Sequence, residues 1–378
     1  MTGTLSGAMR TITKMPLTIP LTMRFQMPWR LRKLGSDGLA LARLARNRLL
    51  HAAGRRRDDR PSIEFNIPFY GYTGGSYAIV VVANMLSRSF NVSFYTTPTN
   101  VLNRYLADQV RMVTAPSMDC DIYVMEAGSD ARLMQRIAAR GARLVISCHG
   151  FPSDGDVSLK NHGYSDSEVY EAFQIASNSH FVTEAQLVAF WQHGANPPDP
   201  RVISNGVDQV VKIGRTRSVG IVGDAALPLK NVARAVAAAE ASLAEEVHVW
   251  GRFSETFGSR RAIWHGFESD KNKLFSSFDV LVSLSFNETQ PLIVLEAMSA
   301  GIPCVLSNLS CYAEIRGLAG VWFVDPSDVA GATAAINDAL DIPAPVRDGL
   351  RAVWERVYSP NVVERKWVEY INELIGRT

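Results

Sequence analysis

Two glutamates stand out as residues that could bind a ligand. Glu288 and Glu296 lie eight positions apart, on either side of a turn within residues 283–305. Carboxylates accept hydrogen bonds from hydroxyl groups, and they repel phosphate groups of the same charge. The pair therefore indicates a ligand that is rich in hydroxyls, such as a sugar or a ribose.

The residues around this pair predict a strand, a loop, a helix and a second strand. Residues 280–284 are apolar and largely branched, as expected of a short buried strand. Pro291 suits the first turn of a helix, Gly301 suits its C-terminal end, and the next strand begins at Cys304. In such a βαβ unit, the helix N-terminus at the carboxyl end of the strand is where phosphate-bearing ligands bind.

Strands and helices alternate from residue 61 onward, in two series of similar size. In the first series we expect strands at 63–67, 92–95, 122–125 and 144–147, a strand-like piece at 173–177, and helices at 77–87, 130–140 and 181–193. In the second we expect strands at 219–222, 247–250, 280–284, from 304, and at 321–324, and helices at 230–244, 271–278, 329–340, 346–356 and 361–375. The pattern predicts an α/β protein with two doubly wound, Rossmann-like domains that face each other across a central cleft.

Other ligand candidates lie at strand ends and helix starts. Gly74 and Gly75 would let the backbone approach a ligand, although an ordinary tight turn would use them equally well. His149 follows the strand at 144–147, where ligand groups gather in such sheets, although a lone histidine is often structural. Lys230 is expected at a helix start, where its charge opposes the helix dipole. A bound diphosphate would explain that position, and the alternative is a solvated lysine.

No metal site or disulfide framework is expected. Asp119 and Asp121 form a D-x-D pattern, as do Asp154 and Asp156, but such short patterns arise easily by chance and we assign neither to a metal. The cysteines are scattered, which indicates free thiols in a reducing compartment. They are Cys120, Cys148, Cys304 and Cys311.

The basic charge of the chain lies at its start. Residues 1–60 hold thirteen Lys and Arg against three Asp and Glu, so the rest carries −8 in a chain whose net charge is +2. Residues 28–57 predict a broken amphipathic helix with a basic face, which would suit either an anchor on an anionic membrane surface or a solvated extension. No apolar run could span a bilayer and no signal peptide is evident, so we expect a cytoplasmic protein, peripheral on the inner face of the membrane if the anchor operates. Nothing downstream indicates a nucleic-acid partner.

Together these residues resemble the motifs of glycosyltransferase family 4, which consists of retaining enzymes with the two-domain GT-B fold. Residues 288–296 match the family's E-x7-E motif, and 296–305 (EAMSAGIPCV) are similar to its EAM-x-x-G-x-P-V-V run. Residues 204–208 (SNGVD) resemble the N-G-V-D that opens the second domain, and Gly74 and Gly75 resemble the glycine pair of the first. The resemblance covers residues 61–378 and is most specific in 283–305.

The resemblance implies a role for each matched residue. Glu288 would bind hydroxyls of the donor sugar, Glu296 those of the nucleotide ribose, and Lys230 the diphosphate, while His149 would contact the sugar near the reacting carbon. The implied catalytic residues are His149 and Glu288, and the implied donor-binding residues are Gly74, Gly75, Gly223, Lys230, Thr289, Gln290, Pro291, Leu292 and Glu296. The chain would divide into an extension (1–60), an acceptor domain (61–205), a donor domain (206–355) and a C-terminal helix (356–378) that packs back on the first domain.

One position departs from the family pattern. An arginine usually follows the strand glycine and helps to hold the phosphates, whereas here Gly223 is followed by Asp224. Arg252 is a candidate to replace that cation. Without a replacement, the loss of a charge-assisted contact worth about 1.5–3 kcal/mol would weaken turnover.

The implied function is a metal-independent, cofactor-free hexosyltransferase. It would move a sugar from a nucleotide-diphosphate sugar to a hydroxyl of a growing glycan, such as a surface polysaccharide or a lipid-linked saccharide. Two alternatives stay open: a GT-B nucleotide-sugar epimerase, and a catalytically weak nucleotide-sugar-binding subunit, which Asp224 would suit. A nicotinamide oxidoreductase is disfavoured because no dinucleotide fingerprint follows either first strand.

Overall fold

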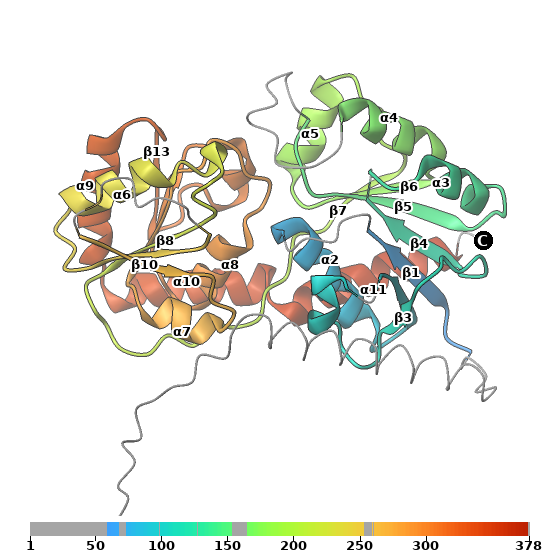
Figure 1. Ribbon diagram of the computed structural model, residues 1–378, viewed down its shortest axis with the longest axis horizontal. Helices are drawn as coiled ribbons and strands as arrows, with labels where there is room; N and C mark the ends of the chain where they lie inside the picture. Colours follow the sequence, from blue (N-terminus) through green and yellow to red (C-terminus); the bar gives the residue numbers. More distant parts are fainter. Residues whose placement is uncertain are drawn as a thin grey trace, which may run out of the picture.

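The computed structural model has two lobes, each built on a parallel β-sheet with helices on both faces (Figure 1). It describes residues 59–67, 73–97, 99–126, 128–152, 165–252, 259 and 261–376. The basic segment at 28–57 lies outside these ranges, and so do Asp154 and Asp156. No described helix has the length and apolar character that a membrane span requires.

The first domain contains a seven-stranded sheet in the order β3-β2-β1-β4-β5-β6-β7. Helix α2 (Gly74–Leu86) packs on one face, and α3 (Ala131–Ala138), α4 (Asp166–Ile175) and α5 (Glu184–Gln192) cover the other. The strands are β1 (Ser62–Asn66), β2 (Asn91–Tyr95), β3 (Arg111–Val113), β4 (Ile122–Met125), β5 (Arg143–Cys148), β6 (Asn178–Phe181) and β7 (Pro200–Val202), with the short helix η1 (Val101–Tyr105) between β2 and β3. The strand order reverses between β1 and β4, and ligands of such sheets bind at the carboxyl ends beside that point.

The second domain repeats this design with a six-stranded sheet in the order β10-β9-β8-β11-β12-β13. Helices α6 (Val232–Ala241) and α9 (Val329–Leu340) cover one face, and α7 (Lys271–Ser276) and α8 (Leu292–Ser299) cover the other. The strands are β8 (Val219–Val222), β9 (Val247–Trp250), β10 (Ala262–Gly266), β11 (Val280–Ser283), β12 (Cys304–Ser307) and β13 (Val321–Val324), with the short helices η3 (Pro228–Lys230) and η4 (Ser310–Ile315). The order reverses between β8 and β11, so their carboxyl ends are the expected ligand edge.

The last two helices join the domains from below in the view of Figure 1. Helix α10 (Ala344–Val357) packs in the core of the second domain, and α11 (Pro360–Gly376) crosses to the first, where Val363 and Trp367 enter the core beneath α2. Ion pairs from Glu364 to Arg88 and from Glu373 to Arg201 hold α11 there. The predicted return of the C-terminal helix to the first domain is therefore confirmed.

Several predicted elements are wrong or incomplete. Residues 173–175, expected in a strand-like piece, belong to α4, and the real strand β6 starts at Asn178. Strands β3, β7 and β10 were not predicted, because they are short or lie at a sheet edge with little apolar periodicity. Lys230 ends η3 instead of opening a helix, since Asn231 adopts a left-handed conformation (φ 50°) and α6 begins after it.

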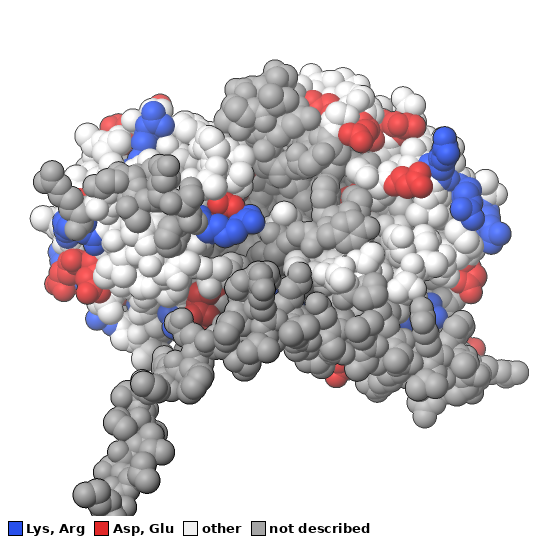
Figure 2. Space-filling model, viewed as in Figure 1, with Lys and Arg blue, Asp and Glu red and all other residues white. Residues whose placement is uncertain are grey.

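Charge on the described surface is mixed. On the face drawn in Figure 2, blue and red side chains occur on both lobes among the described residues. The four cysteines are buried free thiols.

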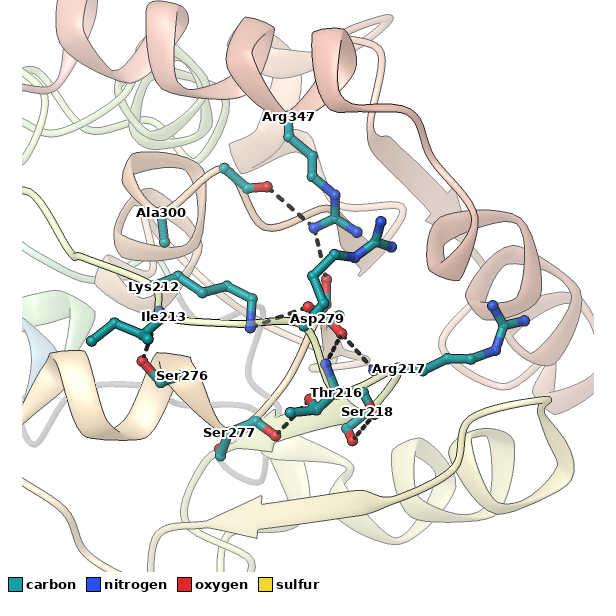
Figure 3. A network of polar contacts seen from close by, with 12 residues as sticks. Lys212, Ile213, Thr216, Arg217, Ser218, Ser276, Ser277, Asp279, Ala300 and Arg347 are labelled. Atoms are coloured by element: carbon teal, nitrogen blue, oxygen red, sulfur yellow. Dashed lines mark hydrogen bonds and ion pairs between the residues drawn. The ribbon is translucent and has the colours of Figure 1, made fainter.

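A buried ion pair anchors the linker between the domains (Figure 3). Lys212, on the linker, lies 3.1 Å from Asp279, which precedes β11, and both side chains are almost completely buried. The other carboxylate oxygen of Asp279 accepts hydrogen bonds from the backbone N–H groups of Thr216 (2.7 Å) and Arg217 (2.6 Å). One carboxylate therefore fixes both the middle of the linker and its entry into β8.

Replacing Lys212 by methionine should destabilise the protein strongly. The variant keeps the aliphatic volume but leaves Asp279 buried without its cation, and such a loss costs about 3–5 kcal/mol. Arg217→Gln is the matched control, because it breaks an ion pair with Asp341 that lies at the surface. Urea unfolding of both variants measures the difference. Equal midpoints would contradict this account of the linker.

Candidate active site

The central feature of the second domain's ligand edge is an ion pair. Lys230 follows β8 and Glu288 follows β11, and their Nζ and Oε1 atoms are 2.7 Å apart. The two loops are also joined by the backbone, since the N–H of Phe286 donates to the carbonyl of Leu229 (2.8 Å). The residues predicted for the phosphates and for the sugar therefore meet beside the point where the strand order reverses.

Asn231 holds Lys230 in place, and sequence reasoning missed it. Its side-chain amide donates to the carbonyls of Leu284 (2.9 Å) and Pro326 (2.8 Å), so it bridges the loops after β11 and β13. The left-handed backbone at this position is one that asparagine tolerates better than most residues. The signal that could have identified Asn231 is its position next to a lysine at an expected helix start.

The start of α8 is open to an anion. Pro291 is its N-cap and no described side chain caps the helix, so Leu292 and Ile293 present backbone N–H groups that have no partner within the helix, whereas Val294 donates to the carbonyl of Pro291 (3.1 Å). Those groups and the positive end of the helix dipole favour a negatively charged ligand. Gly223, at the end of β8, lies against the Lys230 side chain on the same edge.

Glu296 lies one turn into α8, where it faces Lys271. The Nζ of Lys271 is 3.0 Å from Oε2 of Glu296, whose side chain is buried. Burial raises the pKa of Glu296, and the charge of Lys271 opposes that shift. Burial, and then the charge of Glu296, raise the pKa of Tyr77 of α2 to about 12. Sequence reasoning missed both Lys271 and Tyr77, which only the tertiary structure brings to Glu296.

Asp224, the departure from the family pattern, is paired. Its carboxylate lies 2.7 Å from the guanidinium of Arg252, whose side chain is largely exposed. The pairing follows from the backbone: the N–H of Ala225 donates to the carbonyl of Arg252 (2.8 Å), which aligns the ends of β8 and β9. Gly251 permits this approach, since it adopts φ 137° and a Cβ there would lie 1.9 Å from the carbonyl oxygen of Gly223.

The first domain contributes His149 and the glycine turn. His149 follows β5, and a Cβ added to Gly75 at the start of α2 would lie only 2.9 Å from its Cβ, so this close approach requires a glycine. Gly74 has open space around it instead. Burial, and then the neighbouring His180, lower the pKa of His149 to about 3, so the imidazole is neutral near pH 7.

Two contacts join the halves of the site. The hydroxyl of Thr289 donates to the backbone carbonyl of His149 (3.1 Å). The side-chain oxygen of Gln290 accepts a hydrogen bond from the backbone N–H of Asn205 (2.6 Å). The backbone carbonyl of Gln290 accepts a second one from the side-chain amide of Asn205 (3.2 Å). The structure thus brings the sequence-predicted residues of both domains to one place.

A buried carboxyl group at the carboxyl ends of the first domain's strands was not predicted. Glu126 follows β4, the strand between β1 and β5, and one of its carboxyl oxygens is buried without a hydrogen-bond partner among the described residues. Burial raises the pKa of Glu126 to about 8. The strand-end rule that selected His149 would also have selected Glu126, since each directly follows a strand of the sheet and β4 lies beside the reversal of strand order.

Asp119 and Asp121 have no place in this site. They precede β4 and so lie at the opposite edge of the sheet, where the carboxylate of Asp121 accepts the backbone N–H (2.7 Å) and the hydroxyl (2.6 Å) of Ser62. These bonds align the starts of β1 and β4. Within the described residues, no three His, Cys, Asp or Glu side chains gather in an arrangement that could hold a metal ion.

Comparison with known proteins places the second domain near glycosyl transferases. Residues 216–341, one third of the chain, match the family model "Glycosyl transferases group 1". The putative colanic acid biosynthesis glycosyl transferase WcaC of Escherichia coli K12 is 33% identical over 87 residues, 22% of this chain and 21% of that protein. Glycogen synthase of Mycobacterium tuberculosis H37Rv is 37% identical over 101 residues, 26% of this chain and 24% of that protein. The chain thus spans less than a quarter of the length of these curated relatives.

Solved structures match over most of the chain. HepE of Anabaena in complex with UDP aligns with a TM-score of 0.67 and 16% identity, over 82% of this chain and 100% of that chain. Sucrose-phosphate synthase of Thermosynechococcus elongatus aligns with a TM-score of 0.67 and 12% identity, over 84% and 100%. These similarities are of fold, and with the two parallel sheets they confirm the predicted GT-B class.

Replacing Glu126 by glutamine should stabilise the protein above neutral pH. The carboxyl group titrates at about 8 in the folded protein and near its usual 4.5 when unfolded, so its contribution to stability is complete below pH 4.5 and is lost as the pH rises through 8. Glutamine does not titrate, so the variant should gain up to ~1.4 kcal/mol per pH unit over wild type in that window. Thermal unfolding from pH 5 to 9 measures this, with the exposed Glu171→Gln as control. A pH-independent difference would contradict the assigned pKa.

Proposed function

We propose that the protein is a retaining glycosyltransferase, which moves a sugar from a nucleotide-diphosphate sugar to a hydroxyl of a growing glycan. The observation that carries the proposal is the Lys230–Glu288 pair beside the uncapped start of α8, with His149 joined to the same loop through Thr289. A cation and free helix N–H groups suit a diphosphate, and the adjoining carboxylate suits a sugar. The match of residues 216–341 to a glycosyl transferase family supports this reading.

The proposed mechanism uses the charges of the chain itself. As the bond between the anomeric carbon and the diphosphate oxygen breaks, Lys230 and the start of α8 stabilise the negative charge on the leaving group. The acceptor hydroxyl forms its bond to the same carbon on the face that the diphosphate leaves, and its proton passes to a phosphate oxygen. Because the residues supply the positive charge, we propose a reaction that needs no metal.

The carboxylates and His149 would hold the donor. Glu288 accepts hydrogen bonds from hydroxyls of the sugar, and Glu296 accepts them from hydroxyls of the ribose. In each case the ligand takes the place of the lysine that pairs with the carboxylate in the free protein. With a pKa of about 3, His149 is neutral and acts as a hydrogen-bonding group instead of an acid. This is consistent with the transfer of the acceptor proton to phosphate.

A uridine nucleotide is the first donor to test, because structural neighbours were solved with UDP and with UDP-glucose. For the acceptor we propose a surface polysaccharide or a lipid-linked saccharide. The name of the relative WcaC, a colanic acid biosynthesis protein, supports the first, and the basic segment at 28–57 would suit a membrane-bound acceptor. We propose that this segment holds the enzyme on the inner face of the membrane.

Lys230→Ala and Glu288→Gln should both abolish transfer but differ in nucleotide binding. Lys230→Ala should weaken UDP binding by roughly ten- to a hundredfold, the loss of a charge-assisted phosphate contact. Glu288→Gln should leave UDP binding nearly unchanged, because the carboxylate is assigned to the sugar. Calorimetry with UDP and turnover of UDP-glucose on a glycan acceptor separate the two, with Lys366→Ala, an exposed residue of α11, as control.

Wild-type rates in either folded variant would overturn these roles. An epimerase would convert the nucleotide sugar without any acceptor, so analysis of the recovered donor distinguishes that activity. A binding subunit would bind UDP with no turnover on any acceptor.

Asp224 and Arg252 should affect nucleotide binding in opposite directions. Arg252→Ala leaves the Asp224 carboxylate unneutralised beside the phosphate edge, so UDP binding should weaken several-fold, and more at low salt. Asp224→Asn removes the negative charge and releases Arg252, so binding should tighten. Calorimetry at two salt concentrations checks both. If Asp224→Asn weakened binding, the aspartate would have a role other than the one assigned.

A further inference from the structure

Three hydrogen bonds in series lead from the domain linker to His149. The carbonyl of Ile203 lies 2.9 Å from Nε2 of His180, whose Nδ1 is 2.9 Å from the hydroxyl of Ser147, and that hydroxyl is 3.0 Å from Nε2 of His149. Ser147 and His180 are register partners on the parallel strands β5 and β6, and both are buried. The ring of Trp367 from α11 packs 4.5 Å from the His180 ring. The series is thus built into the fold.

The carbonyl at one end of this series determines which atom donates and which accepts in each hydrogen bond. A carbonyl only accepts hydrogen bonds, so His180 carries its proton on Nε2, and its Nδ1 accepts from the Ser147 hydroxyl. With its proton donated, the Ser147 oxygen accepts from Nε2–H of His149. Burial lowers the pKa of His180 to about 4 and that of His149 to about 3, so each ring carries one proton near pH 7. The Nδ1 of His149 is therefore a bare acceptor.

The His149 side chain lies against the glycine turn. The position of a Cβ on Gly75, at the first turn of α2, is 2.9 Å from Cβ of His149 and 3.9 Å from its Nδ1. In the opposite tautomer, Nδ1 would carry the N–H. The side chain would then donate a hydrogen bond to a ligand instead of accepting one. A sugar hydroxyl can pair with either tautomer only if it is free to rotate.

Both ends of the series are tied to neighbouring residues of the second domain. Ile203 lies two positions before Asn205, which bonds twice to Gln290. At the other end, the backbone carbonyl of His149 accepts from Thr289. The proposed donor-binding loop thus contacts the first domain at both ends of one hydrogen-bonded series.

We propose that Ser147 and His180 are positioning residues, which hold the proton of His149 on Nε2 and present its Nδ1 to a hydroxyl of the bound donor sugar. The identity of that ligand rests on the proposed function, whereas the tautomer does not. Loss of the Ser147 hydroxyl should release the tautomer and reduce recognition of the sugar, with little effect on recognition of the nucleotide.

The test combines nitrogen-15 NMR of labelled histidines with donor kinetics. The His149 signals are identified as those lost in His149→Asn. In wild type they should report protonated Nε2 and bare Nδ1 from pH 6 to 8. In Ser147→Ala they should report a mixture of tautomers. The KM for UDP-glucose should rise roughly three- to tenfold, the loss of one neutral hydrogen bond, while the affinity for UDP stays the same.

Two variants make the test specific. Ser147→Thr keeps the hydroxyl and should keep the wild-type tautomer. Ser179→Ala removes an equally buried hydroxyl of β6 that donates to the carbonyl of Pro198, so it should lower stability without changing His149. A protonated Nδ1 in wild type, an unchanged tautomer in Ser147→Ala, or an equal loss of UDP affinity in that variant would overturn the proposal. If no transfer is found at all, the tautomer result still stands or falls by itself.

Discussion

The contact between Asn205 and Gln290 is the constraint on which the site depends. Asn205 lies where the chain leaves the first domain, and Gln290 lies in the loop that carries Glu288. Because Asn205 donates two hydrogen bonds to Gln290, the loop of the second domain is positioned by the linker as well as by its own sheet. The adjacent Thr289 then reaches His149, so one short segment sets the distance between the two halves of the site. Buried hydrogen bonds of this kind are costly to break, which favours one relative placement of the domains.

Charge pairing shapes the site as much as backbone geometry does. Three acidic residues at the ligand edge of the second domain each have a basic partner: Glu288 with Lys230, Glu296 with Lys271, and Asp224 with Arg252. Under the proposed function, a nucleotide sugar would bring phosphates to the basic residues and hydroxyls to the carboxylates. Binding would then replace ion pairs within the protein by hydrogen bonds and ion pairs to the ligand. In the free protein, the basic partners neutralise the carboxylates at this edge.

The sequence was informative where apolar pattern and strand-end position coincide. Strands β8, β9 and β13 and helix α9 were predicted at their observed bounds. His149 came from the rule that ligands gather at strand ends, Glu288 from the pair of carboxylates around a predicted turn, and Lys230 from its expected place at a helix start. Strand β6 was missed because Asn178, Ser179 and His180 read as a polar loop. Each is buried, and each side chain makes at least one hydrogen bond, which lowers the cost of placing it in a core strand. The roles of Lys271, which pairs with Glu296, and of Asn231, which bridges two loops, depend on tertiary contacts. The spacing of residues along the chain does not predict such contacts.

The missed strand also explains why the C-terminal helix matters to the site. A histidine at the centre of β6 needs both ring nitrogens satisfied and its faces covered, or its burial would be too costly. Ile203 and Ser147 satisfy the nitrogens, and Trp367 of α11 packs against the ring. Helix α11 belongs to the last part of the chain, beyond the second domain, yet it completes the core behind His149. The linker is therefore not the only connection between the two domains. The core of the first domain is complete only with α11, which follows the second domain in the chain.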